Sequence, residues 1–156
     1  MAKRKLKTSN KFKFSVVFVL IAMLIVGLCS TVFTLDKHIE TKEVSSTVFK
    51  YGRLDTDGDY VESKAALYTS DYLTVNGLKI EIDEDAEITY SIYFYDEDYN
   101  LVQSKSDLSE DYVYETIEEN PSYCKIVITP TNDKKISWYE KSGYAKQLTI
   151  TVEKER

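Results

Sequence analysis

Three aspartates alternate in the stretch "LDTDGDYVES", and their spacing could support metal chemistry. Asp55, Asp57 and Asp59 surround Gly58, which lies between the last two. Carboxylate oxygens beside a glycine turn are typical ligands of Ca²⁺. An EF-hand loop has its glycine at the sixth position, whereas Gly58 is fourth counting from Asp55. An ordinary Asp-Gly turn is therefore the favoured interpretation and no cofactor is expected, with a weak or structural calcium site at these residues as the alternative.

Aromatic side chains offer a second kind of chemistry, ligand stacking. All 13 tyrosines and the single tryptophan lie after residue 50. Exposed aromatic rings near Asp, Asn and Lys are typical of sugar recognition, because ring faces stack and hydroxyls hydrogen-bond. The predicted ligand-binding residues are Tyr93, Tyr95, Trp138, Tyr139 and Tyr144. The alternative is structural, since tyrosine is favoured in strands and tryptophan in cores.

Catalytic motifs are sparse in this sequence. The single histidine, His38, lies three residues past an uncharged segment that ends at residue 35, and no G-x-S-x-G stretch exists. Both observations argue against Ser-His and Cys-His nucleophile systems. Carboxylate pairs could hydrolyse a glycoside, but 26 acidic residues make such pairs easy to find and uninformative. We expect a protein that is not an enzyme, and a glycosidase is the least favoured function.

Charge divides the chain into two unequal parts. Six Lys/Arg residues and no acid precede residue 14, which defines a basic tail over 1–13. The chain after residue 35 contains 14 basic and 26 acidic residues, a net charge of −12 (14 − 26). Nucleic-acid binding requires clustered Lys/Arg to neutralise phosphates, so a nucleic-acid partner is not expected.

An uncharged segment of 22 residues, 14–35, follows the basic tail. As a helix it would extend roughly 33 Å, enough to cross a bilayer. The basic flank predicts a cytoplasmic N-terminus and an exported C-terminal part, so this is a single-pass protein of the cell membrane. The stretch "GLCS" is similar to a lipoprotein cleavage site at Cys29, but Leu28 occupies the position of a small residue. An uncleaved signal anchor is therefore favoured over a cleaved signal peptide.

The remaining chain divides into a polar stalk (36–45) and a β-rich domain (46–156). "LTVNGLKI" (73–80) predicts a hairpin, because Asn-Gly is the preferred pair for a type I′ turn. Strands are also expected at 46–54 and 113–117, and no window of 11–18 residues has a sustained helical stripe.

Period-two alternation assigns faces to the longer predicted strands. In "ITYSIYFY" (88–95) one face carries Ile88, Tyr90, Ile92 and Phe94 and is expected to be core. The other face, which includes Tyr93 and Tyr95, is expected to be solvated, and "DEDYN" is expected to be a turn. Two further inward-facing sets are predicted: Cys124, Ile126 and Ile128, and Leu148, Ile150 and Val152.

These features predict an all-β sandwich or jelly roll of about seven or eight antiparallel strands, preceded by one transmembrane helix. The stretches 66–75 ("ALYTSDYLTV"), 90–104 ("YSIYFYDEDYNLVQS") and 123–130 ("YCKIVITP") resemble a small jelly-roll module of bacterial surface and phage tail proteins. The resemblance covers about residues 50–152. It implies a galactose-binding-like or carbohydrate-binding-like sandwich, and it concerns the fold more than any activity.

The function expected from the sequence is therefore non-catalytic recognition of a glycan or protein at the cell surface. The alternative is a structural or assembly partner of another envelope protein, which would use the membrane helix or a sheet edge. The expected partners are therefore the membrane, through residues 14–35, and a glycan or an envelope protein.

Overall fold

A computed structural model describes residues 40–116, 120–132 and 134–154. The predicted basic tail and membrane span (14–35) lie outside these residues, and within the described ranges no helix is long and apolar enough to cross a membrane. The described residues form twelve strands, a 3-10 helix and a short α-helix. In chain order these elements are β1 (Thr41–Glu43), η1 (Ser46–Val48), β2 (Phe49–Tyr51), β3 (Arg53–Leu54), β4 (Tyr60–Val61), β5 (Leu67–Thr69), β6 (Leu73–Thr74), β7 (Lys79–Ile82), β8 (Ile88–Tyr95), β9 (Leu101–Leu108), β10 (Tyr112–Val113), β11 (Tyr123–Pro130), α2 (Lys141–Ala145) and β12 (Leu148–Glu153).

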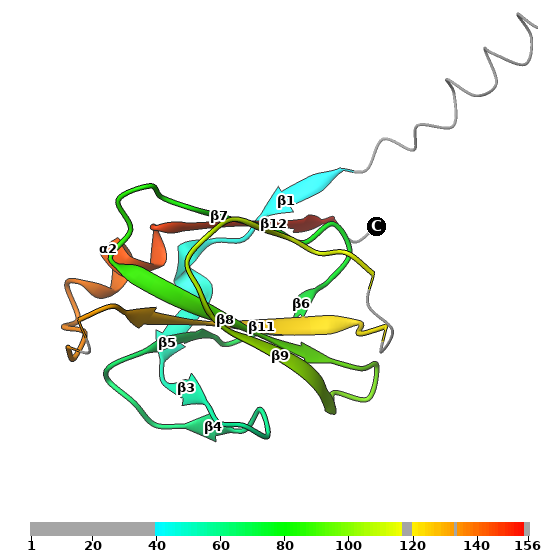
Figure 1. The fold of residues 1–156 in the computed structure, drawn as a ribbon, viewed down its shortest axis with the longest axis horizontal. Helices are drawn as coiled ribbons and strands as arrows, with labels where there is room; N and C mark the ends of the chain where they lie inside the picture. The colour runs from blue at the N-terminus through cyan, green and yellow to red at the C-terminus, as the bar shows by residue number, and fades with distance from the viewer. Residues whose placement is uncertain (1–39, 117–119, 133, 155–156) are drawn as a thin grey trace, which may run out of the picture. The chain divides into compact units, whose positions relative to one another are not determined.

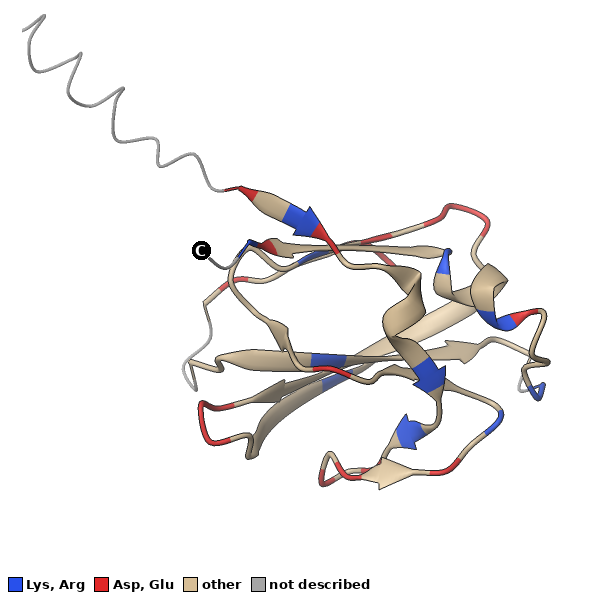
Figure 2. Cartoon of the chain, turned by 180° about the vertical axis from the view of Figure 1, so that it is seen from behind, with Lys and Arg blue, Asp and Glu red and all other residues tan. Residues whose placement is uncertain are grey.

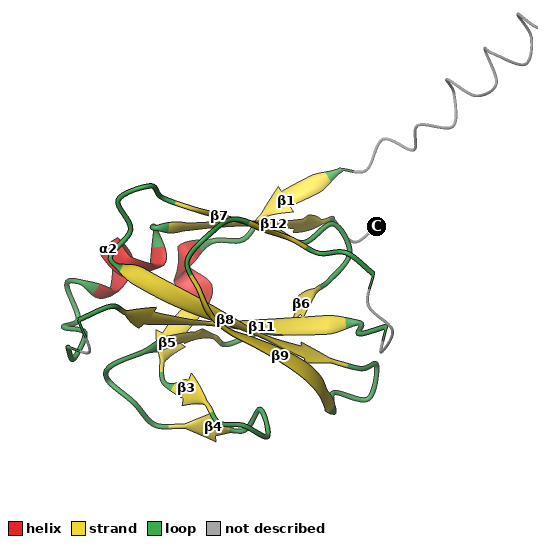
Figure 3. Ribbon diagram, viewed as in Figure 1, coloured by secondary structure: helices red, strands yellow, loops and turns green. Residues whose placement is uncertain are grey.

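Two antiparallel sheets form the two layers of this β-sandwich-like fold (Figure 1). The four-stranded sheet has the order β1-β12-β7-β10. The six-stranded sheet has the order β2-β5-β11-β8-β9, and β6 also pairs with β11. Strands β3 and β4 form a separate hairpin beside the larger sheet, as the yellow arrows of Figure 3 show. The predicted antiparallel all-β class is confirmed, with more and shorter strands than expected.

The core lies between the two sheets and follows the predicted alternation. Strand β8 contributes the four expected side chains, each at most 2 % exposed: Ile88, Tyr90, Ile92 and Phe94. The inward sets of β11 and β12 are also buried in the same core cluster. Period-two patterning therefore predicted the buried face of every long strand except β9, for which no face was assigned.

One buried polar side chain compensates for a change of partner along β11. Strand β5 pairs with β11 at Val127 and Ile128, whereas β6 pairs with it at Tyr123 and Cys124. The amide of Ile126 lies between these two pairings and donates to Thr69 Oγ1 at 3.1 Å. A buried amide without a partner would destabilise the sheet, so the fully buried Thr69 hydroxyl completes the ladder.

The prediction that residues 73–80 form a hairpin was wrong, because the two strands lie in different sheets. Leu78 N does donate to Val75 O at 3.1 Å, so a turn is present at Asn76-Gly77. Strand β6 pairs with β11 and strand β7 with β12 and β10, so the turn links the two sheets. Only Gly77 has a positive φ, 63°, which matches a type II turn and excludes type I′. The turn therefore crosses the sandwich, although its apolar residues are buried as expected.

Three further boundaries differ from the sequence expectation. Residues 41–43, assigned to the polar stalk, form β1 and pair with β12. The strand expected at 46–54 is divided into η1, β2 and β3, with Gly52 (φ 140°) between the two strands. Of the strand expected at 113–117, Val113 lies in β10, residues 114–116 are not in a strand, and residue 117 lies outside the described residues. Local sequence does not determine where such short strands begin and end, because their pairing depends on the neighbouring strand.

Acidic residues gather in the loops that connect the strands (Figure 2). The red segments include "DEDAE" (83–87), "DEDYN" (96–100) and "DTDGD" (55–59). The strands are drawn mostly tan, and short blue segments of Lys and Arg occur in both strands and loops (Figure 2). The loops therefore carry much of the negative charge of the described residues, and the absence of a nucleic-acid partner stays a prediction of the sequence.

Candidate functional site

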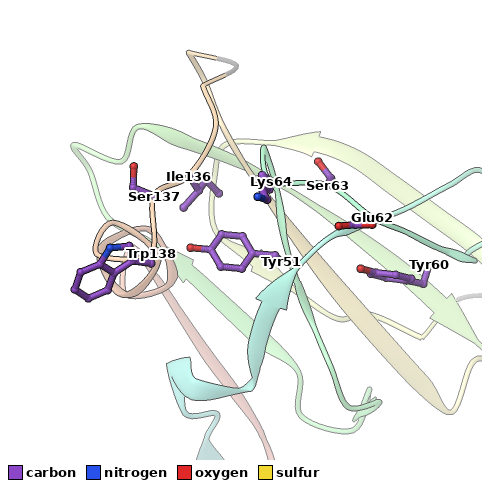
Figure 4. Close-up of a pocket in the computed structure, with 8 residues that line it drawn as sticks. All are labelled: Tyr51, Tyr60, Glu62, Ser63, Lys64, Ile136, Ser137 and Trp138. Atoms are coloured by element: carbon purple, nitrogen blue, oxygen red, sulfur yellow. The ribbon is translucent and has the colours of Figure 1, made fainter.

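A groove of about 530 Å³ lies at the β2 edge of the larger sheet. Three segments that are distant in the sequence line it: the end of β2, residues 60–64, and residues 136–138. Trp138 lies toward one end of the groove and Tyr60 toward the other, with Tyr51 between them (Figure 4). Charged and hydroxyl side chains complete the lining: Glu62, Ser63, Lys64 and Ser137.

Local hydrogen bonds hold the three segments together. Ile136 N donates to Lys64 O at 2.7 Å, which joins two walls of the groove. Ser137 N donates to Glu140 Oε2 at 2.9 Å, and Glu140 N donates back to Ser137 O at 3.0 Å. The first of these bonds lowers the pKa of the Glu140 carboxyl. This reciprocal pair resembles a capping box and fixes the turn that presents Trp138.

Two of the three predicted aromatic residues in this region are exposed. Trp138 is 83 % exposed and Tyr139 is 67 % exposed, and their rings meet edge to face at 5.9 Å. Tyr144 instead packs against the main core from helix α2. An indole that projects into solvent at a groove rim leaves its faces open to a ligand. Tyr144 does not share that open position.

The Tyr51 hydroxyl is a polar group without a partner. Its oxygen is buried, and no hydrogen bond joins it to any residue that the structure describes. The Lys141 amine lies 5.8 Å from the Tyr51 ring centre, over the ring and not at the hydroxyl. Figure 4 shows the hydroxyl end of Tyr51 on the side of Ser137 and Trp138. Buried polar groups are normally satisfied, so this hydroxyl has hydrogen-bonding capacity that a ligand could use.

Gly52 allows two aromatic rings, those of Tyr60 and Tyr68, to pack closely against the backbone at the other end of the groove. A Cβ at Gly52 would lie 2.4 Å from the Tyr60 ring and 3.1 Å from the Tyr68 ring. The two rings lie 5.3 Å apart, and Tyr60 is 55 % exposed. Only glycine allows both the φ of 140° and this close approach, so Gly52 positions the Tyr60 ring at the groove.

The predicted platform of Tyr93 and Tyr95 is largely covered. Tyr95 is only 2 % exposed, so the expectation that it faces solvent was wrong. Its hydroxyl donates to Gly58 O at 3.0 Å, and the Tyr93 hydroxyl donates to Leu54 O at 3.1 Å. Both acceptors belong to the β3–β4 hairpin or its loop, which covers this part of the outer face of β8. The reason lies in tertiary packing, which the alternation of β8 does not contain.

The three predicted calcium ligands form a turn. Asp55 Oδ1 accepts from the amides of Asp57 and Asp59 at 3.0 and 2.9 Å. Gly58 has a φ of 81°, as in a three-residue hairpin loop that ends in a left-handed residue. Among the described residues no group of three His, Cys, Asp or Glu side chains could hold a metal ion. The geometry therefore shows the Asp-Gly turn, and calcium binding there stays a prediction.

A second loop repeats this geometry and carries an aromatic side chain in place of the glycine. Asp96 Oδ1 accepts from the amides of Asp98 and Asn100, each at 2.9 Å. The Asn100 side chain also donates to Asp96, and these bonds lower the pKa of its carboxyl. Tyr99 has a φ of 65° and occupies the position that Gly58 occupies in the first loop. A φ in this region is strained for an aromatic residue, so the backbone conformation at Tyr99 has an energetic cost.

Tyr99 belongs to an aromatic cluster that the sequence did not reveal. Its ring lies 4.7 Å from that of Tyr72 and stacks 4.9 Å from that of Tyr123. Tyr72 is 39 % exposed and Tyr99 is 51 % exposed. The Lys125 amine lies 4.2 Å from the Tyr72 ring centre, and desolvation lowers the pKa of this amine. The sequence indicated this cluster only through Tyr99, an aromatic residue at a turn position. Its contacts with Tyr72 and Tyr123 could not be inferred without the fold.

Comparison with known proteins provides no relative from which a function could be inferred, so the functional argument rests on the geometry of the groove. No family model, no curated protein and no solved structure matches the chain. The groove offers aromatic faces, one unsatisfied hydroxyl, and exposed carboxylate and ammonium groups at Glu62 and Lys64. This arrangement can bind a polar ligand that also has an apolar face.

Proposed function

We propose that the protein is a non-catalytic glycan-binding module, anchored in the cell membrane by residues 14–35 and presented outside the cytoplasm. The observation that carries this proposal is the groove between Trp138 and Tyr60, with the unpartnered Tyr51 hydroxyl between them. Sugars have apolar C–H faces and hydroxyl edges. They therefore match open aromatic rings beside isolated hydrogen-bonding groups.

The charged residues of the groove fit the same kind of ligand. Glu62 and Lys64 are exposed, and Ser63 lies between them. One carboxylate, one ammonium and one hydroxyl provide acceptors and donors without a net charge. A neutral polyhydroxylated ring satisfies such a set better than an anion or a cation does.

The antiparallel two-sheet architecture also supports a more specific proposal, that the domain is a jelly roll. Carbohydrate-binding-like and galactose-binding-like modules are jelly rolls, in which antiparallel sheets pack face to face. The sequence stretches that resemble such modules lie in β5–β6, in β8 and β9, and in β11. We propose a jelly roll of this kind for residues 41–154.

A second cleft, of about 620 Å³, is a weaker candidate for the same role. It lies among β1, η1, β6 and β12, and Tyr72 is the aromatic residue in its lining. Aliphatic side chains and Lys/Glu residues form most of its wall, including Val48, Leu73, Lys42 and Glu153. Such a lining offers little aromatic surface for sugar stacking, so we favour the groove at Trp138.

Assembly through a sheet edge is the alternative function, and strand β9 is the longest edge available to it. Register shifts interrupt the pairing of β9 with β8 at two places, and Asp107 has a φ of 57°. Lys105 adds a charge in the middle of the strand. Bulges and charged residues hinder the addition of another strand to a sheet edge. The β9 edge is therefore weak support for assembly, and we favour glycan binding in the groove.

Glycan binding can be tested with the full chain in detergent micelles. The probes are an array of oligosaccharides built from hexoses and N-acetylhexosamines, together with purified bacterial cell-wall polysaccharides. Because the single tryptophan lies at the groove, a bound sugar should change its fluorescence and protect it from acrylamide quenching.

Three variants separate groove binding from other effects. Trp138→Ala should abolish binding, and Tyr51→Phe should weaken it by removing only the unpartnered hydroxyl. Val113→Ala is the control, since Val113 is 59 % exposed on β10 of the other sheet. No binding to any glycan probe, or full binding by Trp138→Ala, would refute the proposal.

A further inference from the structure

A row of tyrosines continues from the groove across the outer face of the larger sheet. Tyr60 lines the groove and also contacts Tyr68 of β5, with ring centres 5.3 Å apart. The Lys125 amine lies 5.7 Å from the Tyr68 ring and 4.2 Å from the Tyr72 ring, so it connects the two. Tyr72 then contacts Tyr99 at 4.7 Å. The groove and the aromatic cluster are therefore successive parts of one surface.

Strand register explains why these side chains share one face. Tyr68 lies opposite Val127 of β11, and Tyr123 lies opposite Tyr95 of β8. Their neighbours along each strand, such as Leu67 and Cys124, point into the core and are fully buried. Alternation therefore places Tyr68, Lys125 and Tyr123 on the outer face.

We propose that this surface, from Trp138 through Tyr60 and Tyr68 to Tyr72 and Tyr99, is a single track for one linear glycan chain. The proposal rests on the glycan-binding function proposed above and specifies its ligand as a polysaccharide that contacts the protein with several sugar units. Successive rings stack on successive sugars, while Lys125, Glu62 and Lys64 hydrogen-bond to hydroxyls along the chain.

The position of the track argues against the other extended polymers. It crosses β5 and β11, which are interior strands with neighbours on both sides. A peptide therefore finds no free sheet edge there to extend with main-chain hydrogen bonds. Acidic residues surround the track, including Asp59, Asp71 and Asp98, and they repel the phosphates of a nucleic acid. Ring stacking and side-chain hydrogen bonds remain, and these are the contacts that a polysaccharide uses.

The strained backbone at Tyr99 agrees with a binding role for its ring. The loop at residues 55–59, which has the same hydrogen bonds, has Gly58 in the same left-handed position and forms without an aromatic side chain there. Replacing Tyr99 by glycine would relieve the strain and remove the ring together. Because the ring is half exposed, its removal should affect a ligand more than the fold.

The test compares affinity for a ladder of oligosaccharides, from two units upward, of whichever glycan repeat the array identifies. With the full chain in detergent, affinity should rise with length, by about tenfold or more once the ligand reaches the Tyr72–Tyr99 end. Tyr99→Gly, with Tyr72→Ala as a second variant, should remove this rise and leave binding of the disaccharide to the groove. Val113→Ala should behave as the unaltered protein does.

The outcomes distinguish the two proposals. If the disaccharide binds through Trp138 but affinity does not rise with length, the track is refuted and the groove stands. The same holds if Tyr99→Gly and Tyr72→Ala keep the rise in affinity. If no glycan of any length binds, or a library of extended peptides binds instead, both proposals are refuted. Far-UV circular dichroism of each variant confirms that it is folded before it is compared.

Discussion

Tyr95 provides the strictest test of how the outer face of β8 is covered. Alternation alone assigns it to a solvated face, where truncation would have little effect on stability. The structure instead buries it to 2 % exposure, with its hydroxyl 3.0 Å from Gly58 O and its ring edge to face with Tyr72 at 5.0 Å. We therefore expect Tyr95→Ala to be nearly as destabilising as Phe94→Ala on the opposite face.

The magnitudes follow from what each substitution removes. Emptying a packed aromatic site costs about 3–5 kcal/mol, which applies to Phe94→Ala and to Tyr95→Ala. Tyr95→Phe keeps the ring and removes only the hydrogen bond to Gly58. Because Gly58 is partly exposed and water can replace the hydroxyl, this variant should cost about 1 kcal/mol.

Urea denaturation of the full chain in detergent, followed by far-UV circular dichroism, measures these differences. Tryptophan emission is a poor reporter of unfolding, since Trp138 is already 83 % exposed in the folded state. A loss below about 1 kcal/mol for Tyr95→Ala, beside a loss of about 3–5 kcal/mol for Phe94→Ala, would refute the reasoning. It would mean that the β3–β4 loop does not cover β8 in solution.

Three other substitutions or conditions test separate features. Gly77→Val should lower the free energy of unfolding by about 1–3 kcal/mol in the same assay, because a β-branched residue disfavours a φ of 63°; an unchanged midpoint would contradict the assigned turn. In a Cys29→Ser variant, Cys124 should react with a maleimide only after unfolding, because complete burial raises the pKa of its thiol to about 12. Labelling of the folded protein would contradict that burial. Burial also raises the pKa of the Tyr90 hydroxyl above its usual value of 10.0. The unfolded chain ionises first as pH rises, so stability should be intact below about pH 10 and fall above it; stability that rises there would show the opposite shift.

The fold could be predicted where a strand is long and its two faces differ. The core faces of β8, β11 and β12 follow directly from their alternation. The turn at Asn76-Gly77 could not be assigned in the same way, because a two-residue turn satisfies either a hairpin or a crossing between sheets. The choice depends on which strands β6 and β7 meet. Those partners are β11 for β6 and β12 and β10 for β7, and the nearest of them, β10, begins 30 residues after β7 ends (112 − 82).

The candidate site shows the same limit in its chemistry. Trp138 was identifiable from the sequence as an aromatic residue near a turn, but its groove depends on Tyr51 and Tyr60, which only the folded chain brings near it. The aspartates of the first loop suggested a metal, whereas their spacing serves the backbone amides of a turn. That explanation also makes Tyr99 notable, since the second loop has the same hydrogen bonds with a ring where the first has a glycine. Loop geometry alone requires the aspartate and favours glycine. The tyrosine therefore calls for another reason, and a ligand-facing aromatic surface provides one.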